Sequence, residues 1–399
     1  MSQPSAESQN LPRTSRYEFL DLLRGVAVLM MIEGHAMRAL LDHRIRATFA
    51  YDIHELFHGL PAPIFLFAAG AAFAFTLETS ADLRRVADPA ADRKRNWRRR
   101  RRLLNVLLMA YGLQLSYFSL RQTFFSSTPE QFVILLNFNV LQCIVISVLA
   151  LRWLSTWASS QKSLVRICIG LALGMGLATP LVWAIAPSLP MWVGTVLSRH
   201  YSSYFPLFPY AAFTFAGAAW GVRFQMACTR NEESRFLQLT IVAGGVGMVV
   251  STLLAGIPWP PLYAEFWWSS PWYLWLRIGL LALLGALFRR MEIGTASNQG
   301  SNRGRALHLL ALLGRQSFYI YIAHLLVLYG SAYNPRWNML RKLGTNLPFW
   351  ESAVATALLV LIMIFSAMFW DWAKKAHSVR ANQFKWALAT YLIIVFIIS

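Results

Sequence analysis

The feature that most constrains this chain is a series of apolar stretches, each long enough to cross a lipid bilayer. About eleven such stretches occur, near residues 20–41, 57–79, 103–120, 132–153, 164–186, 204–222, 237–258, 272–288, 314–330, 351–371 and 384–398. Inside a bilayer every backbone N–H and C=O must find a partner within the protein, so an isolated stretch crosses as a helix. The sequence therefore predicts an all-α, polytopic membrane helix bundle of about eleven transmembrane helices.

The polar and charged segments predict how these helices are oriented. Residues 1–16 are polar and are expected to form a disordered cytosolic tail, and residues 17–399 to form a single integral-membrane domain. The connection from Leu83 to Arg102 is the most basic one, and basic connections stay in the cytosol. Alternation then places the N-terminus inside and the C-terminus outside. Topology accounts for most of the net charge of +19, which therefore indicates contact with membrane lipid and no nucleic-acid partner.

The first apolar stretch carries an unusual set of ionisable side chains, namely Asp21, Arg24, Glu33, His35 and Arg38. Each such group costs roughly 2.5–3.5 kcal/mol at bilayer depth, so it usually faces the interior of a bundle and marks a functional site. At about 100° and 1.5 Å per residue, Arg24 and His35 lie about 20° and 16 Å apart on a helix, while Glu33 points away. One polar stripe therefore connects the two ends of this helix.

Histidines gather around the connection between the first two stretches. His43 is interpreted as a polar loop residue, whereas burial of His35 in a span favours a functional role. His54 and His58 are four residues apart and would share one face of a helix, as in zinc-binding helices. No third ligand follows at metal-binding spacing, so we expect no metal. Neutral imidazole exchanges a proton near pH 7 and can also carry an acyl group.

Several segments resemble a known enzyme superfamily when they are taken in order. The segment with Asp21, Arg24 and His35 resembles the first helix of the transmembrane acyltransferase superfamily, including its membrane O-acyltransferase family. Three further stretches resemble bacterial relatives of heparan-alpha-glucosaminide N-acetyltransferase, namely residues 58–70, 139–142 and 205–217. A later segment, from Leu313 to His324, is similar to one shared by both branches. The resemblance therefore spans most of the chain.

The resemblance implies transfer of an acyl group, with acetyl as the first candidate, from cytosolic acyl-CoA to an extracytoplasmic saccharide or glycolipid. In the lysosomal family member the catalytic histidine precedes an Asn-Gly-Leu, and His54 is its counterpart here because it precedes His58-Gly59-Leu60. The family has Asn at the positions of His35 and His58, and its large luminal extension is missing from this chain. Compact loops and the likeness together imply a bacterial inner membrane, and a homodimer remains open.

The residues and the resemblance lead to one mechanistic hypothesis. Arg24, with Arg315 as a second candidate, would hold the donor phosphates, and Asp21 would pair with Arg24. His35 or His54 would act as general base or carry the acyl group, with Glu33 as an orienting carboxylate. The remaining candidates are Arg38 on the donor path, His58 beside His54, and His324 as a supporting or gating residue.

Two other functions fit the same residues. A transporter or lipid flippase would use the polar stripe as a path for substrate or protons, without acyl chemistry. A structural or sensory membrane protein would use it only for contacts within the bundle. Substitution of Arg24 and His35 would be silent in the structural case.

Overall fold

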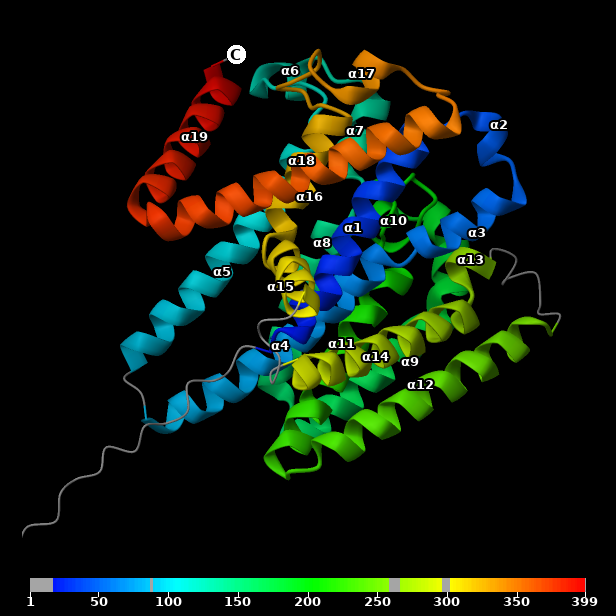
Figure 1. The fold of residues 1–399 in the computed structure, drawn as a ribbon, viewed down its shortest axis with the longest axis vertical. Helices are drawn as coiled ribbons and strands as arrows, with labels where there is room; N and C mark the ends of the chain where they lie inside the picture. Colours follow the sequence, from blue (N-terminus) through cyan, green and yellow to red (C-terminus); the bar gives the residue numbers. More distant parts are fainter. Residues whose placement is uncertain (1–16, 87–88, 258–265, 296–301, 399) are drawn as a thin grey trace, which may run out of the picture.

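The computed structural model describes residues 17–86, 89–257, 266–295 and 302–398, and helices dominate this part of the chain. Within it, β-type pairing is limited to one isolated bridge between Leu41 and Leu347. The all-α prediction is therefore confirmed (Figure 1). The first half of the chain forms α1 Phe19–Leu40, α2 His43–Arg46, α3 Phe49–His58, α4 Pro61–Val86, α5 Pro89–Gly112, α6 Leu120–Phe125, α7 Pro129–Leu136, α8 Val140–Trp157 and α9 Gln161–Ile185. The second half forms the short 3-10 helix Ala186–Ser188, α10 Met191–Leu197, α11 Leu207–Thr229, α12 Glu233–Ala255, α13 Phe266–Ser269, α14 Pro271–Thr295, α15 Asn302–Arg315, α16 Ser317–Leu328, α17 Met339–Leu343, α18 Phe349–Ala376 and α19 Ser378–Ile398.

The helices confirm a polytopic membrane protein. Seven helical segments among the described residues are long and apolar enough to cross a bilayer, and the bent pair α15 and α16 adds an eighth. Each of the eleven predicted ranges contains a helix. Helices α1, α5 and α11 fall outside the set of seven, so the span count of eleven stays a prediction, as does the side on which the N-terminus lies. The tail at residues 1–16 lies outside the described residues.

The basic segment was predicted as a connection and is instead mostly helical. Helix α4 continues to Val86, and α5 begins at Pro89, so the arginine run from Arg98 to Arg102 lies within α5. Arginine and lysine are good helix formers, and proline is favoured in the first turn of a helix. The positive charge is therefore carried on a helix, and its cytosolic location stays a prediction.

The predicted ninth span, residues 314–330, is a broken helix. Helices α15 and α16 meet at an angle of 75° on either side of Gln316. The Gln316 side chain donates to Asp371 Oδ1 (2.9 Å) and accepts from Lys374 Nζ (2.7 Å), which ties the bend to α18. Helix α16 has 12 residues, or about 18 Å, which is too short to cross a bilayer alone. The break separates Arg315 from the helix that carries His324.

Helix α1 lies in the middle of the bundle, in contact with α4, α14, α15, α16 and α18 (Figure 1). Its apolar residues divide between two buried clusters, with Phe19 and Leu23 facing α4 and α11, and Val28 and Ile32 facing α16 and α18. This position buries Asp21 and partly buries Arg24 and His35. Arg38, at the end of the stripe, stays exposed. A central helix with two apolar faces thus holds the ionisable residues in place.

Helices α4 and α11 pack closely against each other beside α1. A Cβ at Gly70 would lie 1.9 Å from the backbone oxygen of Thr214. This contact explains why glycine stands there, because a larger residue would force the two backbones apart. The segments 58–70 and 205–217, which carry part of the family resemblance, therefore pack directly on each other.

Candidate active site

Ionisable residues lie at both ends of α1. We call the end with Glu33, His35 and Arg38 the histidine end, and the end with Asp21 and Arg24 the arginine end. About 16 Å of helix separates Arg24 from His35. The two ends belong to different sets of neighbouring helices, and each holds its own group of polar contacts.

At the histidine end, His35 is oriented by His324 of α16. His35 Nδ1 lies 2.9 Å from His324 Nε2, and His324 Nδ1 lies 2.8 Å from the carbonyl oxygen of Ile320. A carbonyl only accepts, so Nδ1 of His324 carries the proton and neutral His324 accepts at Nε2. His35 must then donate from Nδ1, which leaves a basic lone pair at its Nε2. Tyr329 holds the same region by donating to the His35 carbonyl (3.2 Å).

On the other side of α1, Glu33 contacts two histidines of α3. His54 Nε2 lies 2.8 Å from Glu33 Oε1, and His58 Nε2 lies 2.8 Å from Glu33 Oε2. Glu33 therefore does not orient His35, in keeping with its predicted direction on the helix. His58 lies directly against α1, because a Cβ on Gly34 would come within 1.8 Å of His58 Nδ1. The absence of a side chain at Gly34 is what lets α3 approach.

Glu33, His54 and His58 also form a set of donors that could hold a metal ion, within 4.8 Å of one another. Sequence spacing offers only the two imidazoles, and the fold adds the carboxylate. A metal-bound imidazole usually donates its second N–H to a partner. Nδ1 of His54 is buried and has no hydrogen-bond partner among the described residues. Metal binding through Nε2 would put an N–H at this Nδ1 with no acceptor in the described part of the chain, which argues against a metal ion here. The Nε2 atoms of His54 and His58 also lie 2.8 Å from each other, so the two rings contact one another as well as Glu33.

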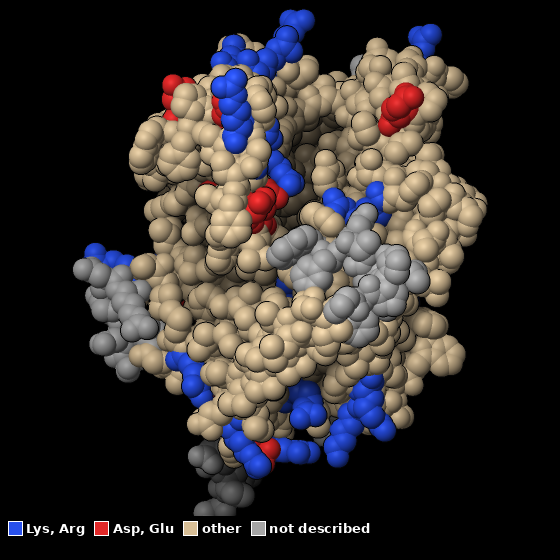
Figure 2. Space-filling model, turned by 90° about the vertical axis from the view of Figure 1, so that its right-hand side faces the viewer, with Lys and Arg blue, Asp and Glu red and all other residues tan. Residues whose placement is uncertain are grey.

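Arg38 and His43 lie farther out. Arg38 donates to Glu55 Oε2 of α3 (2.7 Å), which ties the end of α1 to α3. His43 contacts Asp42 and its side chain is 67% exposed, as expected of a polar loop residue. Figure 2 shows that the face carrying α3 and α13 is hollowed in its upper half, with acidic and basic side chains near the rim. Arg38 was predicted to lie on the donor path with Arg24. It lies instead at the opposite end of α1, paired with Glu55.

A further residue, Arg277 of α14, was missed in the sequence. It is only 6% exposed, and its guanidinium lies over the ring of Tyr273 (3.9 Å) and donates to the Tyr273 hydroxyl. Its Nε has no hydrogen-bond partner among the described residues. A Cβ at Gly59, the residue after His58, would lie 2.2 Å from Arg277 Nη2. The signal was a single cation within the apolar range 272–288, which is costly to bury without an anion.

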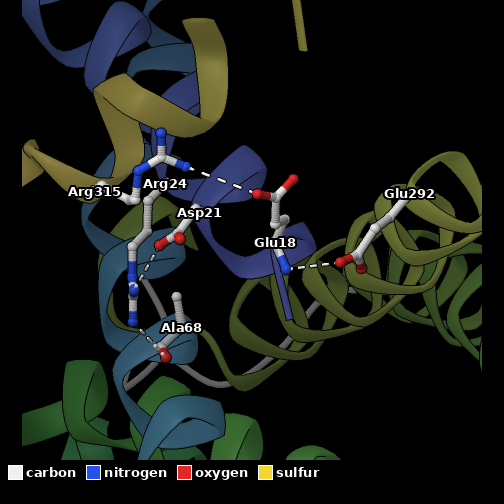
Figure 3. A network of polar contacts seen from close by, with 6 residues as sticks. All are labelled: Glu18, Asp21, Arg24, Ala68, Glu292 and Arg315. Atoms are coloured by element: carbon white, nitrogen blue, oxygen red, sulfur yellow. Dashed lines mark hydrogen bonds and ion pairs between the residues drawn. The ribbon is translucent and has the colours of Figure 1, made fainter. Parts of the chain in front are cut away.

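The arginine end of α1 holds a second polar network (Figure 3). Arg24 lies 3.4 Å from Asp21 and donates to the carbonyl oxygen of Ala68 on α4 (3.1 Å). The expected pairing of Asp21 with Arg24 is therefore present. Arg315 lies 4.0 Å from Glu18, a long contact for an ion pair and worth little in free energy. Both predicted arginines thus belong to one region, where an anionic ligand could compete for Arg315.

Acidic residues that sequence reasoning did not single out complete this network. The backbone N–H of Glu18 donates to Glu292 Oε1 of α14 (2.8 Å), and Arg289 lies 2.7 Å from both Glu292 and Glu233. These contacts join the start of α1 to α14 and α12. They hold the start of α1 in place, one or two helical turns before Arg24.

Comparison with known proteins assigns the chain to a family. No curated protein matches the chain. Residues 16–250 match the family described as heparan-alpha-glucosaminide N-acetyltransferase, catalytic, and this is more than half of the chain. The match includes α1, α3 and α4, and therefore Arg24, Glu33, His35, His54 and His58. The protein therefore belongs to the membrane acetyltransferase family of the heparan-alpha-glucosaminide N-acetyltransferase catalytic domain.

Proposed function

We propose that this protein transfers an acetyl group from acetyl-CoA to a hydroxyl or amine of a saccharide or glycolipid, across the inner membrane of a bacterium. The observation that carries this proposal is the hydrogen-bond chain from Ile320 through His324 to His35. It fixes one tautomer of His35 and leaves Nε2 as a base. A base that is held in one orientation is what proton abstraction from an acceptor requires.

The proposed reaction begins with proton transfer to His35 and ends with the release of coenzyme A. His35 Nε2 takes the proton from the acceptor, whose oxygen or nitrogen forms a bond to the thioester carbonyl carbon. The carbonyl oxygen becomes an oxyanion, which then collapses as the carbon–sulfur bond breaks. The thiolate of coenzyme A leaves and receives the proton from His35. Nε2 of His324 would stabilise the imidazolium of His35, because it accepts a hydrogen bond from Nδ1 of the charged ring.

Two residues at or next to α3 would assist this chemistry. Arg277 is a buried cation beside Gly59, and a developing oxyanion would give it the anionic partner that the described residues do not supply. His54, held by Glu33, is the counterpart of the catalytic histidine of the family and is the alternative base or acyl carrier. A ping-pong route through an acetyl-imidazole and a direct transfer both use this arrangement.

The donor would bind along α1. Arg24 and Arg315 would contact its phosphates at the arginine end, and its long thioester arm would follow the polar stripe toward His35. The long contact between Arg315 and Glu18 supports this role, since phosphate can replace a weak partner. Acetyl-CoA would then enter from the cytosol, while the acceptor reaches the histidine end from the opposite side.

The experiment uses purified full-length protein with acetyl-CoA labelled in the acetyl group, and it follows both thioester consumption and labelling of the protein. We expect His35→Ala to lower the rate by about 10²- to 10⁴-fold, the usual contribution of a positioned base. His54→Ala tests the alternative base, and His43→Ala is the matched control because its ring is exposed. We expect activity to survive prolonged chelation, since the buried Nδ1 of His54 lacks, among the described residues, the acceptor that a metal-bound imidazole usually has.

The outcomes separate the candidate functions. Loss in His35→Ala with normal unfolding temperature supports the proposal, and loss only in His54→Ala moves the base to α3. If no acyl-CoA is bound or consumed by the wild-type protein, acyl chemistry is excluded. Proton-dependent uptake into vesicles would then identify a transporter that uses the same stripe.

A further inference from the structure

A basic pocket lies away from both ends of α1, at the junction of α9, α11 and α12. Its volume is about 600 Å³. In Figure 1 the turn between α11 and α12 lies at the lower end of the molecule, and Figure 2 shows Lys and Arg side chains gathered at that end. Charged side chains line the pocket on one side, five cations and one carboxylate: Lys162, Arg166, Arg223, Arg230, Arg235 and Glu232.

No acidic side chain among the described residues forms an ion pair with these cations. None of the five forms a hydrogen bond or ion pair through its side chain with the described residues, and all five are exposed. Helices α9 and α12 both begin beside the pocket, and the N-terminus of a helix carries a partial positive charge. Like charges gathered in one concave site repel each other until an anion binds. The charge of the pocket therefore selects a multiply hydrogen-bonding anion such as a phosphate.

The other wall of the pocket is apolar and leads to the lipid-facing surface. Ile169 of α9 lines the pocket and is 44% exposed, and Leu173, Leu177 and Leu181 continue the same exposed row at intervals of four residues. On α12, Leu239 lines the pocket and is followed by exposed valines at 242, 246 and 249. Two apolar rows thus begin where the cations end. A ligand with a phosphate at one end and hydrocarbon at the other fits both.

We propose that this pocket binds the phosphate headgroup of an anionic phospholipid, with its acyl chains along α9 and α12. Basic pockets between membrane helices are a general means of holding such headgroups. The phosphates of acyl-CoA share the same anionic chemistry. The apolar rows favour the lipid, because a nucleotide offers no hydrocarbon to cover them.

The experiment compares lipid binding of the full-length protein with that of two charge-matched variants. Arg166→Gln with Arg230→Gln removes two pocket cations, whereas Arg305→Gln with Arg380→Gln removes two exposed cations elsewhere. Bound phosphatidylglycerol and phosphatidylcholine are counted by native mass spectrometry, and acetyl-CoA binding is measured on the same samples. We expect the pocket variant to bind phosphatidylglycerol roughly tenfold or more weakly than wild type, and the control variant to match wild type.

Each result decides the proposal. A selective loss of phosphatidylglycerol binding in the pocket variant supports it. Equal loss in both variants shows a diffuse charge effect and overturns it, as does equal affinity for phosphatidylcholine. If the pocket variant loses acetyl-CoA binding and keeps lipid binding, the site holds the donor phosphates and the lipid assignment is wrong. Unfolding temperatures of the two variants verify that both remain folded.

Discussion

At the residue scale, the chemistry of His35 depends on a residue 289 positions away in the sequence. His35 faces His324, and the Ile320 carbonyl determines which nitrogen of His324 carries a proton. The Ile320 carbonyl therefore sets the tautomer of His324, and His324 in turn sets the tautomer of His35. His324 is fully buried, so its part is to position His35.

The role of His324 can be tested with two substitutions. His324→Gln keeps an amide oxygen that can accept near the position of Nε2, whereas His324→Leu removes the acceptor. We expect the leucine variant to lose about tenfold or more in kcat, which is part of the effect of a positioned base, and the glutamine variant to retain more. The measurement is the rate of acetyl transfer with the KM for acetyl-CoA. A purely structural role would instead change both variants alike.

At the element scale, the crossing of α1 and α3 places Glu33 against His54 and His58. Gly34 provides the room for His58, and the Arg38–Glu55 ion pair closes the outer part of the same contact. On the far side, the bend at Gln316 turns α16 toward α1 and presents His324. Two short helices, α3 and α16, each too short to cross a bilayer by itself, thus build the site around the longer α1.

The crossing predicts an asymmetric effect of two glycine substitutions. In Gly34→Ala the added Cβ would lie 1.8 Å from His58 Nδ1, so α3 must move, at a cost of about 1–3 kcal/mol in the free energy of unfolding. Gly170→Ala on α9 meets no atom within 4 Å and should stabilise the helix by about 0.5–1 kcal/mol. Thermal unfolding and acetyl transfer are measured on both. Full activity of Gly34→Ala would contradict this account of the α1–α3 contact.

At the scale of the whole molecule, positive charge gathers where the membrane boundary is expected. The arginine run of α5 and the cations near the start of α9 and the end of α11 are separated in sequence but share a predicted cytosolic side. The chain carries 37 Lys and Arg against 18 Asp and Glu. The chain therefore has 19 more basic than acidic side chains. We expect this surplus of positive charge to contact anionic lipid headgroups.

Topology follows from this distribution and can be measured in cells. After replacement of the three native cysteines, a single cysteine is introduced by Arg44→Cys on α2 or by Arg98→Cys on α5, both at exposed positions. We expect a membrane-impermeant maleimide to label position 44 in intact cells and position 98 only after permeabilisation. Labelling in the reverse pattern would invert the predicted orientation and place the histidine end in the cytosol.

The main features of the fold could be predicted from sequence because they depend on local composition. Apolar stretches of spanning length predict helices, and the direction of Glu33 relative to His35 follows from helix periodicity alone. The break at Gln316 could not be predicted in this way, because its side chain is held by Asp371 and Lys374, far along the chain. The helical state of the basic segment could not be predicted from its charge either, because an arginine run fits both a helix and a loop.

The sequence by itself determined that this protein is a bundle of membrane helices, that α1 carries a polar stripe, and that the chain resembles membrane acyltransferases. Only the tertiary structure decided that Glu33 belongs to His54 and His58, that His324 orients His35, and that Arg277 lies beside Gly59. The physical reason is the distance along the sequence between the residues that interact. Helix formation and burial follow from neighbouring residues, whereas hydrogen bonds between side chains depend on how distant helices cross, and that is decided by packing of the whole bundle.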